Sequence, residues 1–206
     1  MASDEQKHWT HVYEEKAASS VSWYQPMPEP SLRALEKFGA SLSSSIIDVG
    51  GGASNFVDAL LEQGWRDITV LDIAAPALDA AKARIGPLAD KVHWEVADIT
   101  EWSPPRKFDV WHDRAVFHFL TEPKQRAAYR QALSQGLAAG GLAIVATFAL
   151  DGPERCSGLP VERYDPARLA DALGTSLQLI EAWREEPVTP WGAKQSFNWC
   201  AFRLPA

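Results

Sequence analysis

The sequence has few cysteines and no long hydrophobic run, and each shortage excludes a class of protein. Cys156 and Cys200 are its only cysteines, and they fit neither a CxxC motif nor the spacing of metal ligands. We therefore expect two free thiols in a reducing compartment, and no bound metal. The longest strongly apolar run, "LAIVATFAL" from Leu142, is far shorter than the roughly 20 residues of a membrane-spanning helix. We accordingly expect no membrane partner.

The sequence also lacks an excess of positive charge and a leader segment. Its 20 Lys and Arg residues are outnumbered by 27 Asp and Glu residues, for a net charge of −7. Binding to nucleic acid relies on clustered Lys and Arg, so we expect no nucleic-acid partner. The first residues, "MASDEQKHWTHVYEEK", are charged from residue 4 and lack the apolar core of a signal peptide. We expect a cytoplasmic protein, and nothing in the sequence indicates its oligomeric state.

What the sequence does contain is an alternation of short apolar runs with longer helical patterns. Strands are predicted at "SIIDV", "DITVLDI", "KVHWEVAD", "KFDVWHD" and "GGLAIVATFA", with helices between most of them. The tail has a short helix, "DPARLADALG", and two strand-like runs joined by the turn-rich "PVTPWG". This order predicts an α/β fold, a Rossmann-like, doubly wound and mostly parallel sheet with an antiparallel C-terminal strand. We expect one domain over 1–206, with a helical cap at 1–40 and the core at 41–206.

A glycine-rich turn follows the first predicted strand and reads Asp48-x-Gly50-x-Gly52-x-Ser54. Glycines let the backbone approach a ligand closely, and the following helix presents free N–H groups. Two features weigh against a dinucleotide: Asn55 stands where the third fingerprint glycine belongs, and Asp48 would face a pyrophosphate. An acidic residue here suits S-adenosylmethionine, which has an ammonium, a sulfonium and a ribose but no phosphate.

Acidic residues end the next two predicted strands. Asp72 lies twenty residues after Gly52, where a carboxylate can accept hydrogen bonds from ribose hydroxyls. Asp98 can accept from an adenine amine while Ile99 packs on the ring. Because these groups all follow strand ends, we expect them at the ligand-binding edge of the sheet.

The glycine turn and the acidic residues that follow it, taken in this order, make the sequence resemble class I S-adenosylmethionine-dependent methyltransferases over roughly residues 40 to 205. The resemblance implies a seven-stranded sheet and S-adenosylmethionine as the cofactor, with Ser54 standing where the family often has a third glycine. The cofactor-binding residues that it implies are Trp23, Asp48, Gly50, Gly51, Gly52, Ser54, Asp72, Ile73, Asp98, Ile99, Asp113 and Arg114.

The exit of the fourth predicted strand, "FDVWHDRAVFHFL", is the segment that lines the methyl-transfer pocket in this family. Together with "GWRDITVLDI" and "VSWYQP" it looks like a branch that includes protein-lysine methyltransferases, whose pocket motif runs Asp-Lys-Gly-Thr-apolar-Asp. Here the first acid is Asp113 and the second has become His118, which disfavours a lysine ammonium. We expect His118 as the better catalytic candidate and Asp113 as the second; the alternative is a core or surface histidine.

By the same resemblance, Trp23, Tyr24 and Gln25 would close over the cofactor, although a Pro-rich linker is the alternative. Tyr24, His118 and Arg155 are the candidates for binding substrate. The function expected is methyl transfer to a small molecule. The alternatives are a protein-lysine methyltransferase, a non-catalytic cofactor-binding protein, and an NAD-dependent reductase, which the missing third glycine disfavours.

Overall fold

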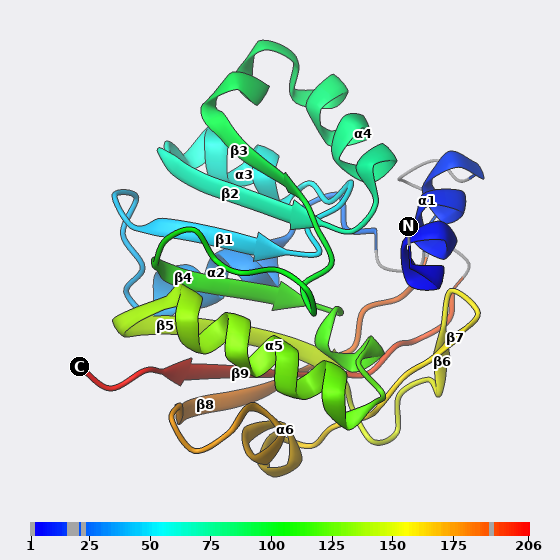
Figure 1. Cartoon of the computed structure of the whole chain (residues 1–206), viewed down its shortest axis with the longest axis vertical. Helices are drawn as coiled ribbons and strands as arrows, with labels where there is room; N and C mark the ends of the chain where they lie inside the picture. Colours follow the sequence, from blue (N-terminus) through cyan, green and yellow to red (C-terminus); the bar gives the residue numbers. More distant parts are fainter. Residues whose placement is uncertain (1–2, 16–20, 22–23, 190–191) are drawn as a thin grey trace.

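The fold is a seven-stranded sheet between two layers of helices (Figure 1). The computed structural model describes residues 3–15, 21, 24–189 and 192–206. The strand order is β3-β2-β1-β4-β5-β9-β8, and β9 pairs antiparallel with both β5 and β8. The predicted fold class is therefore confirmed. The strands of this sheet are β1 (Ser45–Val49), β2 (Asp67–Asp72), β3 (Val92–Val96), β4 (Phe108–Arg114), β5 (Leu137–Phe148), β8 (Gln178–Glu185) and β9 (Phe197–Arg203).

The two faces of the sheet bury two separate apolar clusters. In β1, Ile46 packs into one cluster, whereas Ile47 and Val49 pack into the other, as the alternation of side chains along a strand requires. Side chains of α2, α3 and α4 join the first cluster, and those of α5 and α6 join the second. These helices are α2 (Glu29–Lys37), α3 (Phe56–Gln63), α4 (Ala75–Ile85), α5 (Pro123–Gly136) and α6 (Pro166–Leu173).

Sequence signals for helix ends are visible in the structure. Helix α3 ends at Gly64, whose φ of 92° is a left-handed conformation that glycine adopts without steric cost. Helix α6 begins after Asp165, whose side chain accepts a hydrogen bond from the N–H of Arg168 at 2.8 Å. Helix α5 begins with a reciprocal capping box between Glu122 and Gln125.

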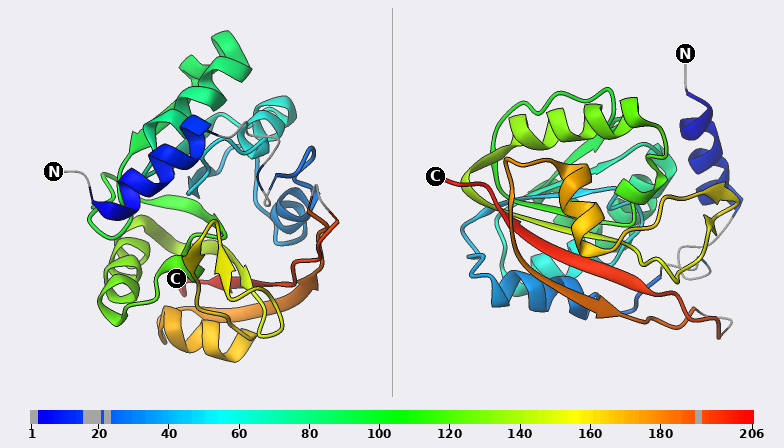
Figure 2. Two further views of the ribbon diagram at one scale, coloured as in Figure 1. Left: turned by 90° about the vertical axis from the view of Figure 1, so that its right-hand side faces the viewer. Right: turned by 90° about the horizontal axis from the view of Figure 1, so that it is seen from below.

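The N-terminal segment contributes two helices with different locations. Helix α1 (Asp4–Glu15) lies outside the sheet layers, at the edge where the parallel strands end and beside α4 (Figures 1 and 2). Helix α2 instead packs against the sheet, where Ala34 and Leu35 are buried. Of these two described helices, α1 is therefore the one placed to cover a site at the strand ends.

The long connection after β5 contains a small hairpin, β6 (Arg155–Cys156) with β7 (Leu159–Pro160). This hairpin lies at the same edge of the sheet as α1 (Figure 2). The described residues also form 3-10 turns at Gly86–Lys91 and Phe117–Phe119. Among the described residues, no helix has the length and hydropathy needed to cross a membrane.

Candidate functional site

The turn after β1 can be formed only with very small residues. Gly50 has a φ of +67°, and a Cβ added to it would lie 2.0 Å from Cγ2 of Val116. Gly52 has a φ of +48°, and its Cβ would lie 2.9 Å from Oδ2 of Asp72 and 2.8 Å from the hydroxyl of Tyr13. The backbone of this turn therefore passes directly against the exits of β2 and β4.

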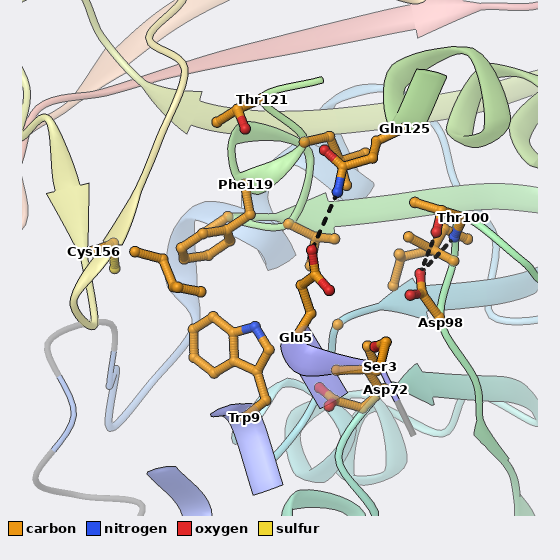
Figure 3. Close-up of a pocket in the computed structure, with 18 of the residues that line it drawn as sticks. Ser3, Glu5, Trp9, Asp72, Asp98, Thr100, Phe119, Thr121, Gln125 and Cys156 are labelled. Atoms are coloured by element: carbon orange, nitrogen blue, oxygen red, sulfur yellow. Dashed lines mark hydrogen bonds between the residues drawn. The ribbon is translucent and has the colours of Figure 1, made fainter. Parts of the chain in front are cut away.

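A cavity of about 730 Å³ opens at the carboxyl ends of β1, β2, β4 and β5. Its walls come from the strand exits, from α1 and the start of α5, and from the β6–β7 hairpin (Figure 3). Of the predicted cofactor residues, the structure places Gly50, Asp72, Ile73, Asp98, Ile99 and Arg114 in this lining.

Asp72 is the carboxylate at the end of β2 and is only 5% exposed. Its Oδ1 accepts a hydrogen bond from the N–H of Ala74 at 2.8 Å. Burial raises the pKa of Asp72 to about 7, and the nearby Asp48 adds to the rise, while backbone N–H groups of Ala74, Gly52 and Ile73 oppose it. The carboxylate is therefore poorly solvated and suited to a ligand that donates hydrogen bonds.

Asp98 follows β3 on the same side of the cavity. Its Oδ1 accepts from both the N–H and the hydroxyl of Thr100, at 2.8 and 2.7 Å (Figure 3). These bonds fix the direction of the carboxylate. Ile99 is buried and also lines the cavity, so an acidic acceptor and an apolar surface stand side by side.

Helix α1 forms the wall opposite the strand ends. Trp9 packs edge-on against Phe119, with ring centroids 5.0 Å apart, and both line the cavity. Tyr13 lies one turn further along α1 and also lines it. The helix is tied to the sheet edge by Gln6, whose side-chain N–H donates to the carbonyl of Ile73 at 3.3 Å.

Asp113 is fully buried at the end of β4 and does not line the cavity. It accepts hydrogen bonds from the hydroxyl of Tyr129 at 2.7 Å and from the N–H of Val116 at 2.9 Å. Tyr129 accepts in turn from Nε1 of Trp111 at 2.9 Å. Burial raises the pKa of Asp113 to about 6, although the hydrogen bonds from Tyr129 and from the N–H of Val116 oppose the rise. The structure thus gives Asp113 a role in shaping the loop rather than contact with a ligand.

The loop that Asp113 shapes brings Arg114 and Ala115 to the cavity. Ala115 has a φ of +75°, an unusual conformation for a residue with a Cβ. The guanidinium of Arg114 lies 5.4 Å from the ring centroid of Phe197 in β9. Burial lowers the pKa of Arg114 from its usual range, and the nearby Glu185 and Asp48 oppose that effect. A partly desolvated positive charge therefore faces the cavity from the β4 exit.

His118 does not lie where a catalytic base is needed. It is fully buried, is absent from the cavity lining, and packs between Phe119 and Phe148. Its Nδ1 accepts from the N–H of Phe148 at 3.3 Å, and its Nε2 has no hydrogen-bond partner among the described residues. Burial and the charge of Arg114 lower the pKa of His118 to about 3. The structure corrects the expectation that this side chain faces the pocket, because it is a core histidine.

Other predicted residues support the turn or lie away from the cavity lining. Asp48 is buried beneath the turn, where its carboxylate accepts from Nδ1 of His112 at 2.7 Å. The hydroxyl of Ser54 accepts from the N–H of Phe56, the first residue of α3. Gly51 and Gly52 belong to the turn but do not line the cavity, and Trp23 falls outside the described residues.

The predicted substrate residues Tyr24 and Arg155 are also absent from the lining. The hydroxyl of Tyr24 accepts from the side-chain amide of Asn55 at 3.5 Å. The guanidinium of Arg155 donates to the carbonyl of Gly158 within its own hairpin. Neither placement supports the substrate contact expected from the sequence.

Sequence reasoning missed several residues that line the cavity. Trp9 and Tyr13 stand four residues apart, the spacing that places two rings on one face of a helix. That spacing was the available signal. No comparable sequence pattern indicates Gln195 or Cys156. Gln195 reaches the cavity from the connection between β8 and β9, and Cys156 reaches it from the β6–β7 hairpin.

Comparisons with known proteins agree with this geometry. A family model described as a methyltransferase domain matches residues 46–141. A malonyl-[acyl-carrier protein] O-methyltransferase from Anoxybacillus flavithermus is 27% identical over 113 residues, which are 54% of this chain and 42% of that protein. The match thus spans about two fifths of the relative's length.

Solved structures show the same fold along nearly the whole chain. A 1,6-didemethyltoxoflavin-N1-methyltransferase from Burkholderia thailandensis, solved with its namesake compound and S-adenosylhomocysteine, has a TM-score of 0.74 at 19% identity and covers 98% of this chain and 88% of its own. The N-methyltransferase NodS from Bradyrhizobium japonicum, in complex with S-adenosylhomocysteine, has a TM-score of 0.70 at 18% identity, covering 96% and 98%.

Proposed function

We propose that this chain is a class I S-adenosylmethionine-dependent methyltransferase that transfers the methyl group to a small-molecule acceptor. The observation that carries the proposal is the cavity at the strand ends. Its lining includes the buried carboxylate of Asp72 in β2, Asp98 after β3 and Gly50 of the glycine turn. Helix α1 forms the side opposite the strand ends. The named activities of the methyltransferases described above support the same conclusion.

The residues of the cavity fit S-adenosylmethionine. Asp72 offers a buried carboxylate for the two hydroxyls of a ribose, and Asp98 with Ile99 offers an acceptor and an apolar face for an adenine. Gly50 lines the cavity, and without a side chain it leaves its backbone accessible to a ligand there. When bound, this cofactor supplies a methyl group that is already activated by its attachment to a sulfonium.

The size and shape of the cavity favour a small acceptor over a protein lysine. Its volume of about 730 Å³ lies within the range of roughly 300–1,000 Å³ typical of small-molecule sites. Four aromatic side chains, Trp9, Phe119, Phe148 and Phe197, are among the residues that line the cavity with Arg114. A lysine ammonium would be repelled by Arg114 and would find His118 buried elsewhere in place of the family's second acid.

The chain's contribution to the reaction is therefore orientation and exclusion of water rather than acid–base chemistry. His118 and Asp113, the two candidate bases, are fully buried and outside the cavity lining. Helix α1 covers one side of the site, and the hydrogen bonds of Asp113 fix the position of the β4 exit. A fixed approach of the acceptor, with water displaced when the ligands bind, accelerates transfer from an activated donor.

A labelling experiment tests this proposal. The purified protein is incubated with a cell lysate and S-adenosylmethionine that carries a radioactive methyl group, and the products are separated by size. We expect label in the small-molecule fraction, and a loss of that label with the Asp72→Ala variant. Label confined to protein would instead support the lysine methyltransferase alternative. Binding of S-adenosylhomocysteine without any label transfer would support a non-catalytic cofactor-binding protein.

A further inference from the structure

Gln195 is a buried residue that lines the cavity from the start of β9, far along the sheet edge from Asp72. It is 8% exposed and stands two residues before β9 begins. Because β9 runs antiparallel to β5, its start lies at the edge where the parallel strands end (Figure 1). Four strand spacings of about 4.8 Å separate β9 from β2, which places the two strands about 19 Å apart across the sheet. Gln195 and the residues expected to hold the nucleoside therefore belong to different ends of the cavity.

Hydrogen bonds on both sides hold the backbone of Gln195 in place. Its N–H donates to the carbonyl of Pro187 at 3.0 Å, across the connection between β8 and β9. The carbonyl of the next residue, Ser196, accepts from the N–H of Ala149 at 2.9 Å, which ties the segment to the chain that leaves β5. The point from which the Gln195 side chain projects is therefore fixed by the fold.

The side-chain amide of Gln195, in contrast, makes no hydrogen bond within the described part of the chain. The side-chain atoms there that lack both a partner and any exposure belong to other residues, such as His118 and Thr147. The amide of Gln195 therefore keeps access to open space, and the cavity is the open space that this residue lines. An amide left unpaired in a buried position costs free energy, which a ligand with matching groups recovers.

The surroundings of Gln195 do not call for a charged ligand. The lining residues supplied by the described parts of β5, β9 and the β6–β7 hairpin are uncharged: Phe148, Cys156, Leu159, Pro160 and Phe197. Arg114 lines the cavity from β4, and the carboxylates of Glu185 and Asp48 lie close enough to act on its charge. That charge therefore has counter-charges within the protein, and an acceptor need not supply one.

We propose that Gln195 forms a subsite that recognises an uncharged methyl acceptor through an N–H donor next to a C=O acceptor, as in a lactam or imide ring. The N–H of such a ring donates to Oε1 of Gln195, and its carbonyl accepts from Nε2, so one amide makes both hydrogen bonds. A buried amide also discriminates, because an acceptor without these groups leaves it unpaired. This inference rests on the proposed function and specifies the substrate class of its site.

Three rings of the same size test the subsite. δ-Valerolactam has the adjacent donor and acceptor, cyclohexanone has the acceptor alone, and protonated piperidine carries a positive charge. Each is titrated by NMR into protein saturated with S-adenosylhomocysteine, and the dissociation constants are compared. The variants are Gln195→Leu, Gln195→Glu and a matched control, Gln63→Leu, at the exposed end of α3 and outside the cavity lining.

We expect wild-type protein to bind the lactam about 5-fold or more tightly than the ketone, the range of one net hydrogen bond. Gln195→Leu should abolish this preference, because it removes both the donor and the acceptor. Gln195→Glu keeps acceptor oxygens but loses the N–H donors when ionised, so it should reduce the preference. Gln63→Leu should leave it unchanged.

The amino-acid carboxylate of the cofactor is a second group that the N–H donors of Gln195 could bind. S-adenosylhomocysteine and 5′-methylthioadenosine separate the two sources, because they share the adenosine and only the first has that carboxylate. We expect all three variants to bind both nucleosides within about threefold of wild type. A Gln195→Leu variant that loses affinity for S-adenosylhomocysteine, but not for 5′-methylthioadenosine, would assign Gln195 to the cofactor.

Three further results would overturn the subsite. They are equal binding of lactam and ketone to the wild type, tighter binding of protonated piperidine than of the lactam, and a lactam preference that persists in Gln195→Leu. If Gln195→Leu does not fold, the ratio of lactam to ketone affinity in the wild type and in Gln195→Glu decides the matter.

Failure of the subsite is distinguishable from failure of the proposed function. The lactam and ketone titrations are repeated without cofactor. If S-adenosylhomocysteine did not bind at all, the proposed function would fail, while a lactam preference that depends on Gln195 would still support the subsite. If the cofactor binds and label reaches small molecules but the preference is absent, only the subsite is wrong.

Discussion

His112 holds Asp48 beneath the glycine turn: Nδ1 of the imidazole lies 2.7 Å from Oδ1 of the carboxylate. Nε2 of His112 lies 2.9 Å from the hydroxyl of Ser31 in α2, so the ring bridges α2, β4 and β1. Because a carboxylate only accepts, Nδ1 of His112 carries a proton and donates it to Asp48. The other oxygen of Asp48 lies against Gly51, where an added Cβ would approach it to 2.5 Å.

Replacement of His112 by Leu should destabilise the protein, because it leaves the Asp48 carboxylate buried without its donor. We expect the free energy of unfolding in urea to fall by about 3 kcal/mol. The Ser31→Ala variant loses one neutral hydrogen bond and should cost about 1 kcal/mol. A His112→Leu variant within 1 kcal/mol of wild type would show that the bridge does not support the turn.

The affinity for S-adenosylhomocysteine should rise with pH because of Asp72. Its pKa in the free protein is raised to about 7, and only the ionised carboxylate has both oxygens free to accept from ribose hydroxyls. Calorimetry should therefore show an affinity that increases up to about 10-fold per pH unit below pH 7 and levels off above it. The Asp72→Asn variant should bind more weakly with a flat profile. A steep profile that persists in this variant would assign the titration to another group.

The Asp72→Asn substitution should stabilise the folded protein when no cofactor is bound. A carboxyl whose pKa is raised on folding opposes folding increasingly as pH rises from its unfolded value near 4 to its folded value of about 7. The stability gain of Asp72→Asn should therefore grow over that window and remain constant above it. Urea denaturation at pH 5 and pH 8 measures the difference. An equal gain at both pH values would contradict the raised pKa.

The β-strand and helix order could be predicted from the sequence because each element carries its own periodicity and end signals. Gly64 and Asp165 mark helix ends, and Ile46 and Ile47 alternate between the two faces of the sheet. Asp72 and Asp98 were predicted correctly as cavity residues because they immediately follow strands, where the chain direction fixes their position.

The side chains after β4 could not be placed in this way. Asp113 stands at the end of β4, and His118 lies in a 3-10 turn beyond the left-handed Ala115, so no regular periodicity tells which side chains face inward after the strand ends. Trp9 reaches the cavity from a helix far away in sequence, and only packing brings it there. The sequence therefore predicted the cavity residues at the ends of β2 and β3 better than the placement of the side chains from Asp113 to His118.

Ala115 should tolerate glycine and reject branched side chains. Its φ of +75° costs about 1 kcal/mol for a residue with a Cβ. Ala115→Gly relieves that strain but makes the unfolded chain more flexible, so the free energy of unfolding should stay equal or rise by up to about 1 kcal/mol. Ala115→Val should lower it by more than 1 kcal/mol, because β-branched residues fit this region poorly. Equal stability of the Gly and Val variants would argue against the strained conformation.

His118 should matter for stability but not for methyl transfer. Its pKa is lowered to about 3, so it stays neutral at working pH, and it does not line the cavity. His118→Leu leaves the N–H of Phe148 without its acceptor and should cost about 1–3 kcal/mol of unfolding free energy. Below the melting temperature, kcat should remain within about threefold of wild type. A loss of 100-fold or more, with the fold intact, would restore the catalytic assignment.

The most direct test of the account is calorimetric titration of the protein with S-adenosylhomocysteine and, separately, with NADH. The account places a nucleoside against Asp72 and Asp98 and gives the Gly50 turn no third fingerprint glycine for a pyrophosphate. It predicts saturable binding of S-adenosylhomocysteine at one site, weakened at least 10-fold by Asp72→Ala, and no binding of NADH. Tight binding of NADH with none of S-adenosylhomocysteine would contradict it.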